Sequence, residues 1–299
     1  MKIAIAGGSV FIGKALTEKL LAENHEVYIL TRESKNSESV KYVRWLHTND
    51  QPELELEHTD IFINLAGESL NSGRWTTERK KRILHSRLIA TQEINRIISK
   101  MTQKPKVLLN ASAIGYYGTS LSHVFTEEHL AQPSDFLSQT VHLWEKEASQ
   151  SISLGVRTVF MRFGVVLGKN NGALPRMVMP YRLFVGGTVG SGKQWLSWIH
   201  IQDVVDATIH CIQNDNIHGA VNFTTPHPEP MKNFGQTIAK FLGKPHYFPT
   251  PAPLLQVLLG EMSVLILEGQ KVLPHQLTQH NFSFSYPTLN EALDNLLIK

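Results

Sequence analysis

Apolar and polar positions along the first two hundred residues alternate between two patterns. Short runs rich in β-branched and other apolar residues end at Gly, Ser or Asn, and amphipathic stretches separate them. Such runs predict strands of a parallel sheet, because a strand that is covered on both faces is apolar on both faces. The runs are residues 2–7, 26–30, 60–67, 106–112 and 156–164. Helices are predicted over residues 12–23, roughly 76–100 and 135–153, so the pattern favours an α/β fold with a doubly wound parallel sheet.

The pattern changes after residue 165, where glycine and proline become frequent and helices of mixed length follow. We expect a main α/β domain over residues 1–165 and a smaller C-terminal cap over residues 166–299. Residues 194–223 are expected to return to the main sheet. The segment "GEMSVLILEGQKVLP" has helix-like apolar spacing, which favours the core of the cap or a dimer surface over a catalytic role.

The composition, with 42% hydrophobic and 18% charged residues, is that of a soluble globular protein. A net charge of +3 suits an anionic small molecule and is weak support for a nucleic-acid partner. Cys211 is the single cysteine, so no disulfide framework is expected, and the histidines lack the spacing of metal ligands. Neither a signal-peptide pattern nor an apolar run of about 20 residues is present, so we expect a cytoplasmic protein without a membrane partner.

The first strand leads through a glycine-rich turn into a helix, in the stretch "IAIAGGSVFIGKALTEKLL". Gly7 allows a tight turn, and Gly13 allows close packing of the helix on the strand. The free N–H groups at the helix start would then face a pyrophosphate, which the helix dipole also favours. A plain turn without a ligand is the alternative. The predicted cofactor-binding residues are Gly7, Gly8, Ser9, Val10, Phe11, Ile12 and Gly13.

The end of the second strand indicates which dinucleotide is bound. An NAD-dependent enzyme usually has an acidic side chain there, which accepts hydrogen bonds from the ribose hydroxyls. Here the strand ends in Thr31 and Arg32, and the first acid is Glu33. Thr31 and Arg32 are suited to bind a 2′-phosphate, which a carboxylate would repel. We therefore expect NADP(H), with a solvated surface role for Arg32 as the alternative.

Several further motifs extend over almost the whole chain. They include "NLAGE" (64–68), "AIGYYG" (113–118), "RFGVVLG" (162–168), "GSGKQWLSWIHIQDVV" (190–205), "LLGEMSVLILEGQKVLP" (258–274) and "FSFSYPTLNEAL" (282–293). On these motifs the chain resembles the extended short-chain dehydrogenase/reductase superfamily, in its atypical, sugar-epimerase-like branch with a C-terminal domain of unknown function. The resemblance implies a Rossmann domain that binds NADP(H) and a C-terminal substrate lobe.

The resemblance also implies roles for residues around the cofactor and substrate. Asn64, Leu65, Ala66 and Gly67 would lie against the adenosine side of the cofactor. A structural cross-link between strands is the alternative for Asn64, since a buried amide must find hydrogen bonds in any case. In "SWIHIQDVV", His200 would face the substrate or cofactor, and Asp203 is expected to cap the following helix.

The densest basic segment is "RWTTERKKRILHSR" (74–87). A nucleic-acid-binding helix is disfavoured, because the charges are spread around the helix and aromatic residues are few. A solvated face is the better interpretation for Lys80, Lys81 and Arg82. Arg74 and Arg87 match family motifs and are predicted to reach an anionic group of the substrate or cofactor, such as a phosphate.

The chain departs from the superfamily at its usual catalytic pair. Related reductases and epimerases use Tyr-x-x-x-Lys, in which the lysine lowers the tyrosine pKa so that the phenol shuttles a proton. None of the seven tyrosines has a lysine four residues later. The segment "SAIGYYG" offers Ser112, Tyr116 and Tyr117 as catalytic residues at the carboxyl end of a strand. The alternative is that both tyrosines only pack against the nicotinamide or the cap.

The second departure is Val10, at the place of the middle glycine in the family's G-x-x-G-x-x-G. If this position needs a left-handed backbone, valine costs about 1–3 kcal/mol and weakens NADP binding. Two hypotheses about function remain. The first is an NADP(H)-dependent oxidoreductase or epimerase-like enzyme on a small polar substrate; the second is a non-catalytic NADPH-binding sensor that acts through a protein partner. A homodimer is left open.

Overall fold

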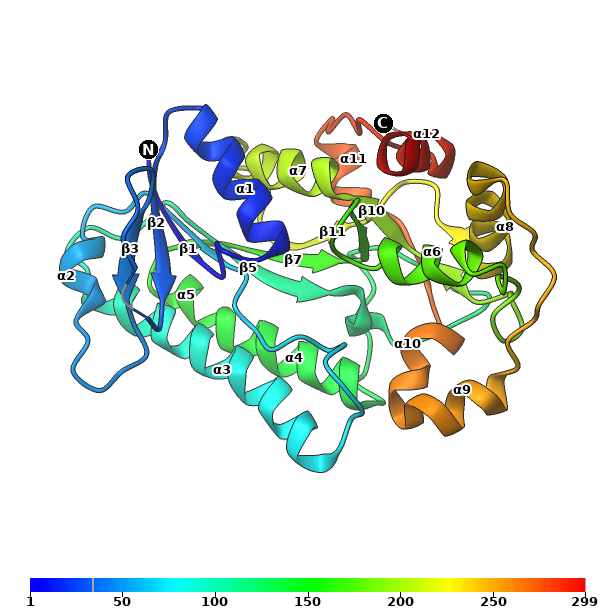
Figure 1. The fold of residues 1–299 in the computed structure, drawn as a ribbon. Helices are drawn as coiled ribbons and strands as arrows, with labels where there is room; N and C mark the ends of the chain where they lie inside the picture. Colours follow the sequence, from blue (N-terminus) through cyan, green and yellow to red (C-terminus); the bar gives the residue numbers. More distant parts are fainter. Residues whose placement is uncertain (34, 299) are drawn as a thin grey trace.

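The centre of the structure, a computed structural model that describes residues 1–33 and 35–298, is a seven-stranded sheet (Figure 1). Its order is β11-β7-β5-β4-β1-β2-β3, and every neighbouring pair is parallel. The chain builds outward from β1 to β3, then crosses back to β4 and builds the other half, which is the doubly wound arrangement. The predicted fold class is therefore confirmed. The strands are β1 (Lys2–Ala6), β2 (Glu26–Thr31), β3 (Lys41–Arg44), β4 (Ile61–Asn64), β5 (Val107–Ala113), β7 (Arg157–Phe163) and β11 (Gly219–Phe223).

Helices cover both faces of the sheet because its inner strands are apolar on both faces. In β1, Ile3 and Ile5 pack in the same cluster as α1 (Phe11–Ala22) and α7 (Ile201–Gln213). The intervening Ala4 and Ala6 pack with α3 (Thr77–Lys100) on the opposite face. Helices α2 (Pro52–Leu56), α4 (Phe136–Ala148) and α5 (Gln150–Ser153) lie on the side of α3 (Figure 1).

The strands predicted from apolar runs agree with the observed ones to within three residues at each end. The four-residue strand β3 escaped prediction because "KYVR" contains only two apolar positions. Strand β11 pairs with β7 at the edge of the sheet, and α7 packs against α1, so residues 201–223 belong with the seven-stranded sheet in one main unit.

A C-terminal lobe lies beside the carboxyl ends of the strands, toward which β5 and β7 point (Figure 1). Its core surrounds the fully buried Trp198 and includes α6 (Leu174–Arg182), α8 (Met231–Leu242) and α12 (Leu289–Leu293). Three two-stranded sheets lie outside the seven-stranded one. They pair β8 (Val165–Leu167) with β10 (Trp198–His200), β9 (Trp195–Leu196) with β12 (Glu229–Pro230), and β6 (Val124–Phe125) with β13 (Lys271–Val272).

The remaining helices of the lobe are α9 (Ala252–Leu259), α10 (Val264–Leu267) and α11 (His275–Gln279). A bilayer-spanning helix would need a longer apolar stretch than any helix within residues 1–33 and 35–298 provides.

Candidate cofactor and active site

The turn between β1 and α1 needs glycine at two positions. Gly7 has a φ of +81°, and a Cβ built on it would lie 2.9 Å from the carbonyl oxygen of Leu65. A Cβ on Gly13 would collide with the backbone of Gly7 and Gly8. The start of α1 is therefore pressed against the carboxyl end of β1, as the spacing of the glycines predicts.

Val10 stands directly before α1 in an extended conformation, with φ −115° and ψ 153°. The left-handed backbone that would have made valine costly is absent, so the strain considered from the sequence does not arise. Its side chain is 68% exposed and provides no cap for the helix. The effect of Val10 on the cofactor is thus limited to contacts of its two methyl groups.

The N–H groups of Phe11, Ile12 and Gly13 have no hydrogen-bond acceptor among the described residues. The first turn of α1 also carries no acidic residue, so the positive end of the helix dipole is uncompensated. The ring of Phe11 packs against the loop after β8, where a Cβ on Gly168 would lie 2.7 Å from it. The turn is thereby fixed against the lobe while its N–H groups stay available for an anion.

Arg32 follows β2 at the same edge of the sheet. Within the described part of the chain, no hydrogen bond or ion pair involves its guanidinium, whereas its carbonyl oxygen lies 2.9 Å from Nε2 of His47. The Thr31 hydroxyl accepts the N–H of Glu33 at 3.2 Å. On the neighbouring strand β3, Arg44 pairs in register with Thr31, so a second arginine follows this edge of the sheet. Its Nε donates to Asp50 at 2.7 Å. Sequence reasoning missed Arg44 because it missed β3.

Asn64 ends β4 and is fully buried. Its amide nitrogen donates to Oγ1 of Thr91 at 3.0 Å and to Oδ1 of Asn110 at 2.7 Å, and its oxygen accepts the N–H of Ala66 at 3.1 Å. The side chain thus joins β4 to β5 and α3 and shapes the turn through Leu65, Ala66 and Gly67. These contacts are those of the structural cross-link; a contact with adenosine stays a prediction.

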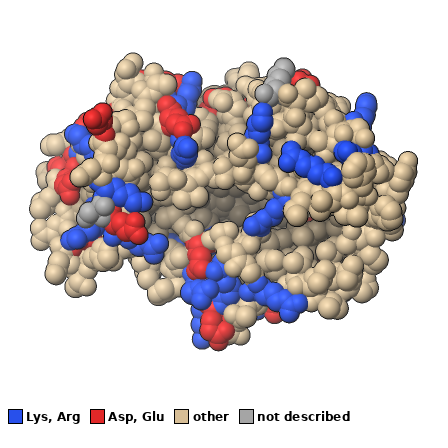
Figure 2. All heavy atoms as spheres, in the orientation of Figure 1, with Lys and Arg blue, Asp and Glu red and all other residues tan. Residues whose placement is uncertain are grey.

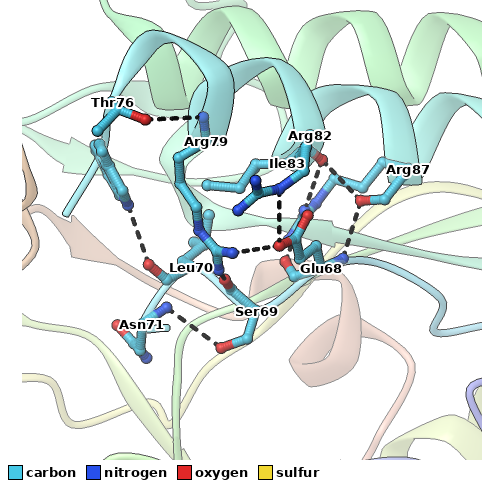
Figure 3. Close-up of polar contacts among 11 residues, drawn as sticks. Glu68, Ser69, Leu70, Asn71, Thr76, Arg79, Arg82, Ile83 and Arg87 are labelled. Atoms are coloured by element: carbon cyan, nitrogen blue, oxygen red, sulfur yellow. Dashed lines mark hydrogen bonds and ion pairs between the residues drawn. The ribbon is translucent and has the colours of Figure 1, made fainter. Parts of the chain in front are cut away.

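Three arginines of α3 contact Glu68 in Figure 3, two at its carboxylate and one at its backbone carbonyl. Arg79, almost fully buried, forms an ion pair with Glu68 and donates to the carbonyl of Ser69, and Arg82 lies 3.4 Å from the same carboxylate. Arg87 donates to the backbone oxygens of Glu68 at 3.0 Å and of Ile83 at 2.9 Å. With one carboxylate for three guanidinium groups, the cluster keeps a net positive charge.

Arg87 also lies against Gly67, where a Cβ would come within 3.2 Å of its side chain. Burial lowers the pKa of Arg87 to about 10, so it remains charged at neutral pH. A half-buried cation beside the turn after β4 is suited to an anionic ligand. The predicted contact between Arg87 and a phosphate therefore has a structural basis and stays a prediction.

Arg74 binds a different part of the molecule. Its guanidinium donates to the carbonyl oxygens of Val257 and Leu258, at the C-terminal end of α9. Lys80 forms an ion pair of 2.6 Å with Glu261, in the short 3-10 turn after that helix. The basic segment before and within α3 thus fastens the C-terminal lobe to the main unit, and an anion contact of Arg74 stays a prediction.

Ser112 and Tyr117 belong to one buried network at the end of β5. The Ser112 hydroxyl donates to Glu145 at 2.5 Å, and Glu145 accepts two hydrogen bonds of 2.8 Å from Arg162. Arg162 also donates to the Tyr117 hydroxyl at 2.9 Å, which in turn donates to Asn222 at 2.8 Å. Arg162, which lies within the motif "RFGVVLG", is the cation beside Tyr117 that the sequence alone did not reveal.

Burial raises the pKa of Tyr117 to about 12, and Arg162 offsets this only in part. Tyr116 stacks on His142 with ring centroids 4.1 Å apart, and the Arg162 guanidinium lies 3.4 Å above the Tyr116 ring. Both tyrosines are thus held by the protein itself, and the phenol of Tyr117 stays protonated at neutral pH. A catalytic role for Ser112, Tyr116 or Tyr117 stays a prediction.

Helix α4 presents to this network two aliphatic side chains that are four residues apart, the spacing of the Tyr-x-x-x-Lys pair. A Cβ on Gly115 would lie 3.5 Å from Cβ of Leu137 and 4.0 Å from a methyl of Val141. Leu137 and Val141 therefore face the 3-10 turn Ile114–Tyr117, where the motif elsewhere in the superfamily would supply a proton donor and a cation.

His200 and Asp203 make contacts that the sequence alone did not reveal. His200 is buried, and its Nδ1 accepts the N–H of Gln202 at 3.0 Å, so it is His200 that caps α7. Asp203 instead accepts the N–H groups of Ser285 at 2.6 Å and Tyr286 at 3.1 Å. The expectation for Asp203 was wrong because a distant segment, not the helix end, supplies its donors. The His200 ring lies 3.9 Å from that of Tyr286, and its contact with substrate stays a prediction.

Figure 2 shows a hollow across the middle of the molecule, with Lys and Arg side chains on its rim. It lies between the nucleotide-binding unit and the C-terminal lobe, beside the carboxyl ends of the strands (Figure 1). Ligands of doubly wound sheets bind at this edge. The glycine turn, the unpaired N–H groups and the doubly wound sheet define a protein of the Rossmann-type, nucleotide-binding class.

The chain belongs to the NAD dependent epimerase/dehydratase family, which residues 3–223 match, and residues 250–296 match a domain of unknown function, DUF1731. The epimerase family protein YfhF of Bacillus subtilis is 48% identical over 99% of this chain and 98% of its own length. The human epimerase family protein SDR39U1, solved with NADPH, is 32% identical, with a TM-score of 0.89 over all of both chains. The nucleoside-diphosphate sugar epimerase of Corynebacterium glutamicum is 28% identical, with a TM-score of 0.81 over 99% of this chain and 58% of that one. The resemblance predicted from the motifs is confirmed.

Proposed function

We propose that the protein binds NADP(H) and acts as an oxidoreductase or epimerase-like enzyme on a small polar substrate. One observation carries the proposal: N–H groups at the start of α1 and the guanidinium of Arg32, which have no partner among residues 1–33 and 35–298, lie at the ends of two adjacent parallel strands. The N–H groups suit a pyrophosphate, and the guanidinium suits the 2′-phosphate that distinguishes NADP from NAD.

The residues present fit this cofactor. The backbone contacts at Gly7 and Gly13 leave no room for side chains, so the turn can approach a ligand closely. Leu65, Ala66 and Gly67 would contact the adenosine side, and Arg87 beside Gly67 would supply positive charge. The human relative solved with NADPH supports this choice. When bound, NADP(H) supplies or accepts a hydride.

The residues near the end of β5 would orient the substrate instead of shuttling a proton. The Ser112 hydroxyl is directed to Glu145, and the Tyr117 phenol is hydrogen-bonded on both sides with a raised pKa. A proton shuttle would need a phenol that titrates near neutral pH. We therefore propose that Tyr117 holds Arg162 and Asn222 in place and that Tyr116 shapes the wall of the site.

A second function, a non-catalytic NADPH sensor that acts on a protein partner, is favoured by the continuation of the same network. The Asn222 amide donates to the carbonyl of Leu273 at 3.0 Å. Glu127 accepts N–H groups from Asn222, His275 and Gln276 at 2.9–3.2 Å. A change at Ser112 would thereby reach the lobe through hydrogen-bonded side chains.

Calorimetric titration with NADPH, NADP⁺ and NADH tests the cofactor assignment. We expect binding of both NADP forms and markedly weaker binding of NADH; absence of heat and of thermal stabilisation with NADPH would refute the proposal. NADPH absorbance with aldehydes, ketones and nucleotide sugars then separates the two functions. Nucleotide sugars belong in the panel because one relative is named for them. Turnover supports the enzyme, and tight NADPH binding without turnover supports the sensor.

A further inference from the structure

Strand β3 ends in an arginine, Arg44, beside the end of β2 (Figure 1). Arg44 pairs in register with Thr31, and the N–H of the next residue, Trp45, donates to the carbonyl of Thr31 at 3.1 Å. Two residues in register on neighbouring strands leave the same face of the sheet, with their backbones about 4.8 Å apart. Arg44 and Thr31 therefore project from one face at the carboxyl edge of the sheet.

That face is the one that α1 covers. Ile29 and Tyr42, which stand two residues before Thr31 and Arg44, both pack in the cluster that contains Leu16 of α1. Because side chains of a strand return to the same face at every second residue, Thr31 and Arg44 lie on this side of the sheet. The start of α1 and the ends of β2 and β3 thus share one face and one edge.

The turn that follows β3 is attached to Arg32. Nε2 of His47 donates to the carbonyl of Arg32 at 2.9 Å, and the N–H of Asp50 donates to the carbonyl of His47 at 3.1 Å. Leu46, between β3 and this turn, has a φ of +68°, a conformation that bulky residues rarely adopt. Such a conformation persists only where the surroundings impose it. Residues 47–50 are therefore held in a defined position against the residue that follows β2.

The guanidinium of Arg44 is oriented by this turn. Its Nε donates to Oδ1 of Asp50 at 2.7 Å, and Oδ2 of Asp50 accepts the N–H of His47 at 3.2 Å. The Asp50 side chain is 3% exposed, whereas that of Arg44 is 55% exposed. Neither terminal NH₂ group of Arg44 has a hydrogen-bond partner within residues 1–33 and 35–298. Asp50 thus fixes one side of the guanidinium and leaves its other donors available to a ligand.

The chemistry of this corner suits a phosphate monoester better than a ribose diol. A phosphate monoester carries a charge of about −1.5 to −2 at neutral pH and has three strong acceptor oxygens. Arg32 and Arg44 together supply two positive charges and two forked sets of donors that match such a group. A ribose diol needs an acceptor instead, and the Asp50 carboxylate is turned inward and already hydrogen-bonded.

We propose that Arg44 is a second ligand of the 2′-phosphate of NADP(H), which it binds together with Arg32 across the ends of β2 and β3. This inference rests on the proposed binding of NADP(H), and it adds a residue that determines the preference for the phosphorylated dinucleotide. Asp50 is a positioning residue, because it acts on the phosphate only through Nε of Arg44.

Calorimetric titration of the full chain with NADPH and NADH tests the proposal. Arg44→Met removes the guanidinium, and we expect it to weaken NADPH binding about tenfold. NADH binding should be unchanged, since NADH has no 2′-phosphate. Arg44 is exposed, so the fold should tolerate the substitution, which thermal unfolding without ligand checks.

Lys41→Met is the matched control. Lys41 lies at the other end of β3, is also exposed, and also pairs with a carboxylate, that of Glu26, at 2.6 Å. Its replacement removes the same charge from the same strand, away from the carboxyl edge. The affinities of this variant for NADPH and NADH should both equal those of the wild type.

Two further titrations place the effect at the 2′-phosphate. Arg44→Met should weaken the binding of 2′,5′-ADP by the same factor as that of NADPH and leave 5′-AMP unchanged, because only the former carries the 2′-phosphate. Arg32→Ala should keep part of the preference for NADPH over NADH, and the double variant with Arg44→Met should lose that remainder.

The outcomes separate this inference from the proposed function. A wild type that binds NADPH in preference to NADH, with the same affinities in Arg44→Met, overturns the role of Arg44 and leaves the NADP(H) assignment standing. An equal loss of NADPH and NADH affinity in Arg44→Met also overturns it, since the arginine would then support the fold of the site and not the 2′-phosphate. A wild type that binds neither NADPH nor 2′,5′-ADP refutes the proposed function and this inference with it.

Discussion

Glu145 and Arg162 form a buried ion pair with two parallel hydrogen bonds of 2.8 Å, one on each carboxylate oxygen. The pair joins α4 to β7 beneath the predicted active-site edge, and it also fixes Ser112 and Tyr117. Its partners therefore position the very groups that the sequence offers as catalysts. Since both charges are desolvated, loss of either leaves the other uncompensated.

Replacement of Arg162 tests this role. Arg162→Met leaves Glu145 buried without a cation, and we expect the free energy of unfolding to fall by about 3–5 kcal/mol. Urea denaturation at neutral pH measures the change. Arg82→Met is the control, because that arginine is exposed and lies 3.4 Å from Glu68, where an ion pair contributes about 1 kcal/mol or less. An equal fall in the free energy of unfolding in the two variants would show that the buried ion pair contributes no more to stability than the exposed one.

The choice of NADP(H) over NAD(H) depends on Arg32. Arg32→Ala should weaken NADPH binding about ten- to a hundredfold, because a hydrogen bond to a charged group contributes about 1.5–3 kcal/mol. NADH binding should be unchanged, since it has no 2′-phosphate. Calorimetric titration of both cofactors measures the difference. Lys35→Ala provides the control: this exposed lysine lies three residues further on, 3.7 Å from Glu33. A parallel loss of NADH affinity would contradict the assignment.

Val10 should matter little. Because its backbone is extended and its side chain is exposed, Val10→Gly relieves no backbone strain. We expect NADPH affinity to stay within about threefold, well below the ten- to hundredfold that about 1–3 kcal/mol of strain would give. A gain of tenfold or more on titration would show that the valine methyl groups obstruct the pyrophosphate.

The sheet and the glycine turn were predictable because local patterns determine them. Apolar runs longer than four residues predicted five strands. The spacing of Gly7 and Gly13 predicted the close packing of the start of α1 on the turn after β1, which a nucleotide-binding turn requires. The short strand β3 carries too few apolar residues for such a pattern, so Arg44 was missed with it.

The polar network was beyond sequence reasoning for a different reason. Glu145 and Arg162 are 17 positions apart, and Asp203 and Ser285 are 82 apart. Nothing local shows that Arg162 faces Tyr117, or that His200 and not Asp203 caps α7. Such pairings depend on how the elements pack.

The burial of His200 predicts a pH dependence of stability. Burial lowers its pKa from 6.5 to about 4, so the unfolded chain binds a proton between these values and the folded chain does not. Stability contributed by the neutral imidazole is thus complete above pH 6.5 and is lost as the pH falls toward 4, at roughly 1.4 kcal/mol per pH unit. His200→Asn keeps a capping oxygen and should flatten this part of the curve of unfolding free energy against pH. An unchanged slope would mean that other groups cause it.

Removal of the Tyr117 hydroxyl separates positioning from proton transfer. General acid–base catalysis contributes about 10²–10⁴-fold, so Tyr117→Phe should lower kcat that strongly if the phenol shuttles a proton. The Tyr117 phenol has a pKa of about 12 and is hydrogen-bonded to Arg162 and Asn222, so we expect kcat to fall less than tenfold and its pH profile to stay unchanged. The free energy of unfolding should fall by about 1–3 kcal/mol, because these two partners are left unpaired. Steady-state rates with any substrate found in the NADPH screen, together with urea denaturation, measure both effects. A hundredfold loss of kcat at unchanged stability would instead identify Tyr117 as the acid, and would mean that cofactor or substrate binding shifts its pKa toward neutrality.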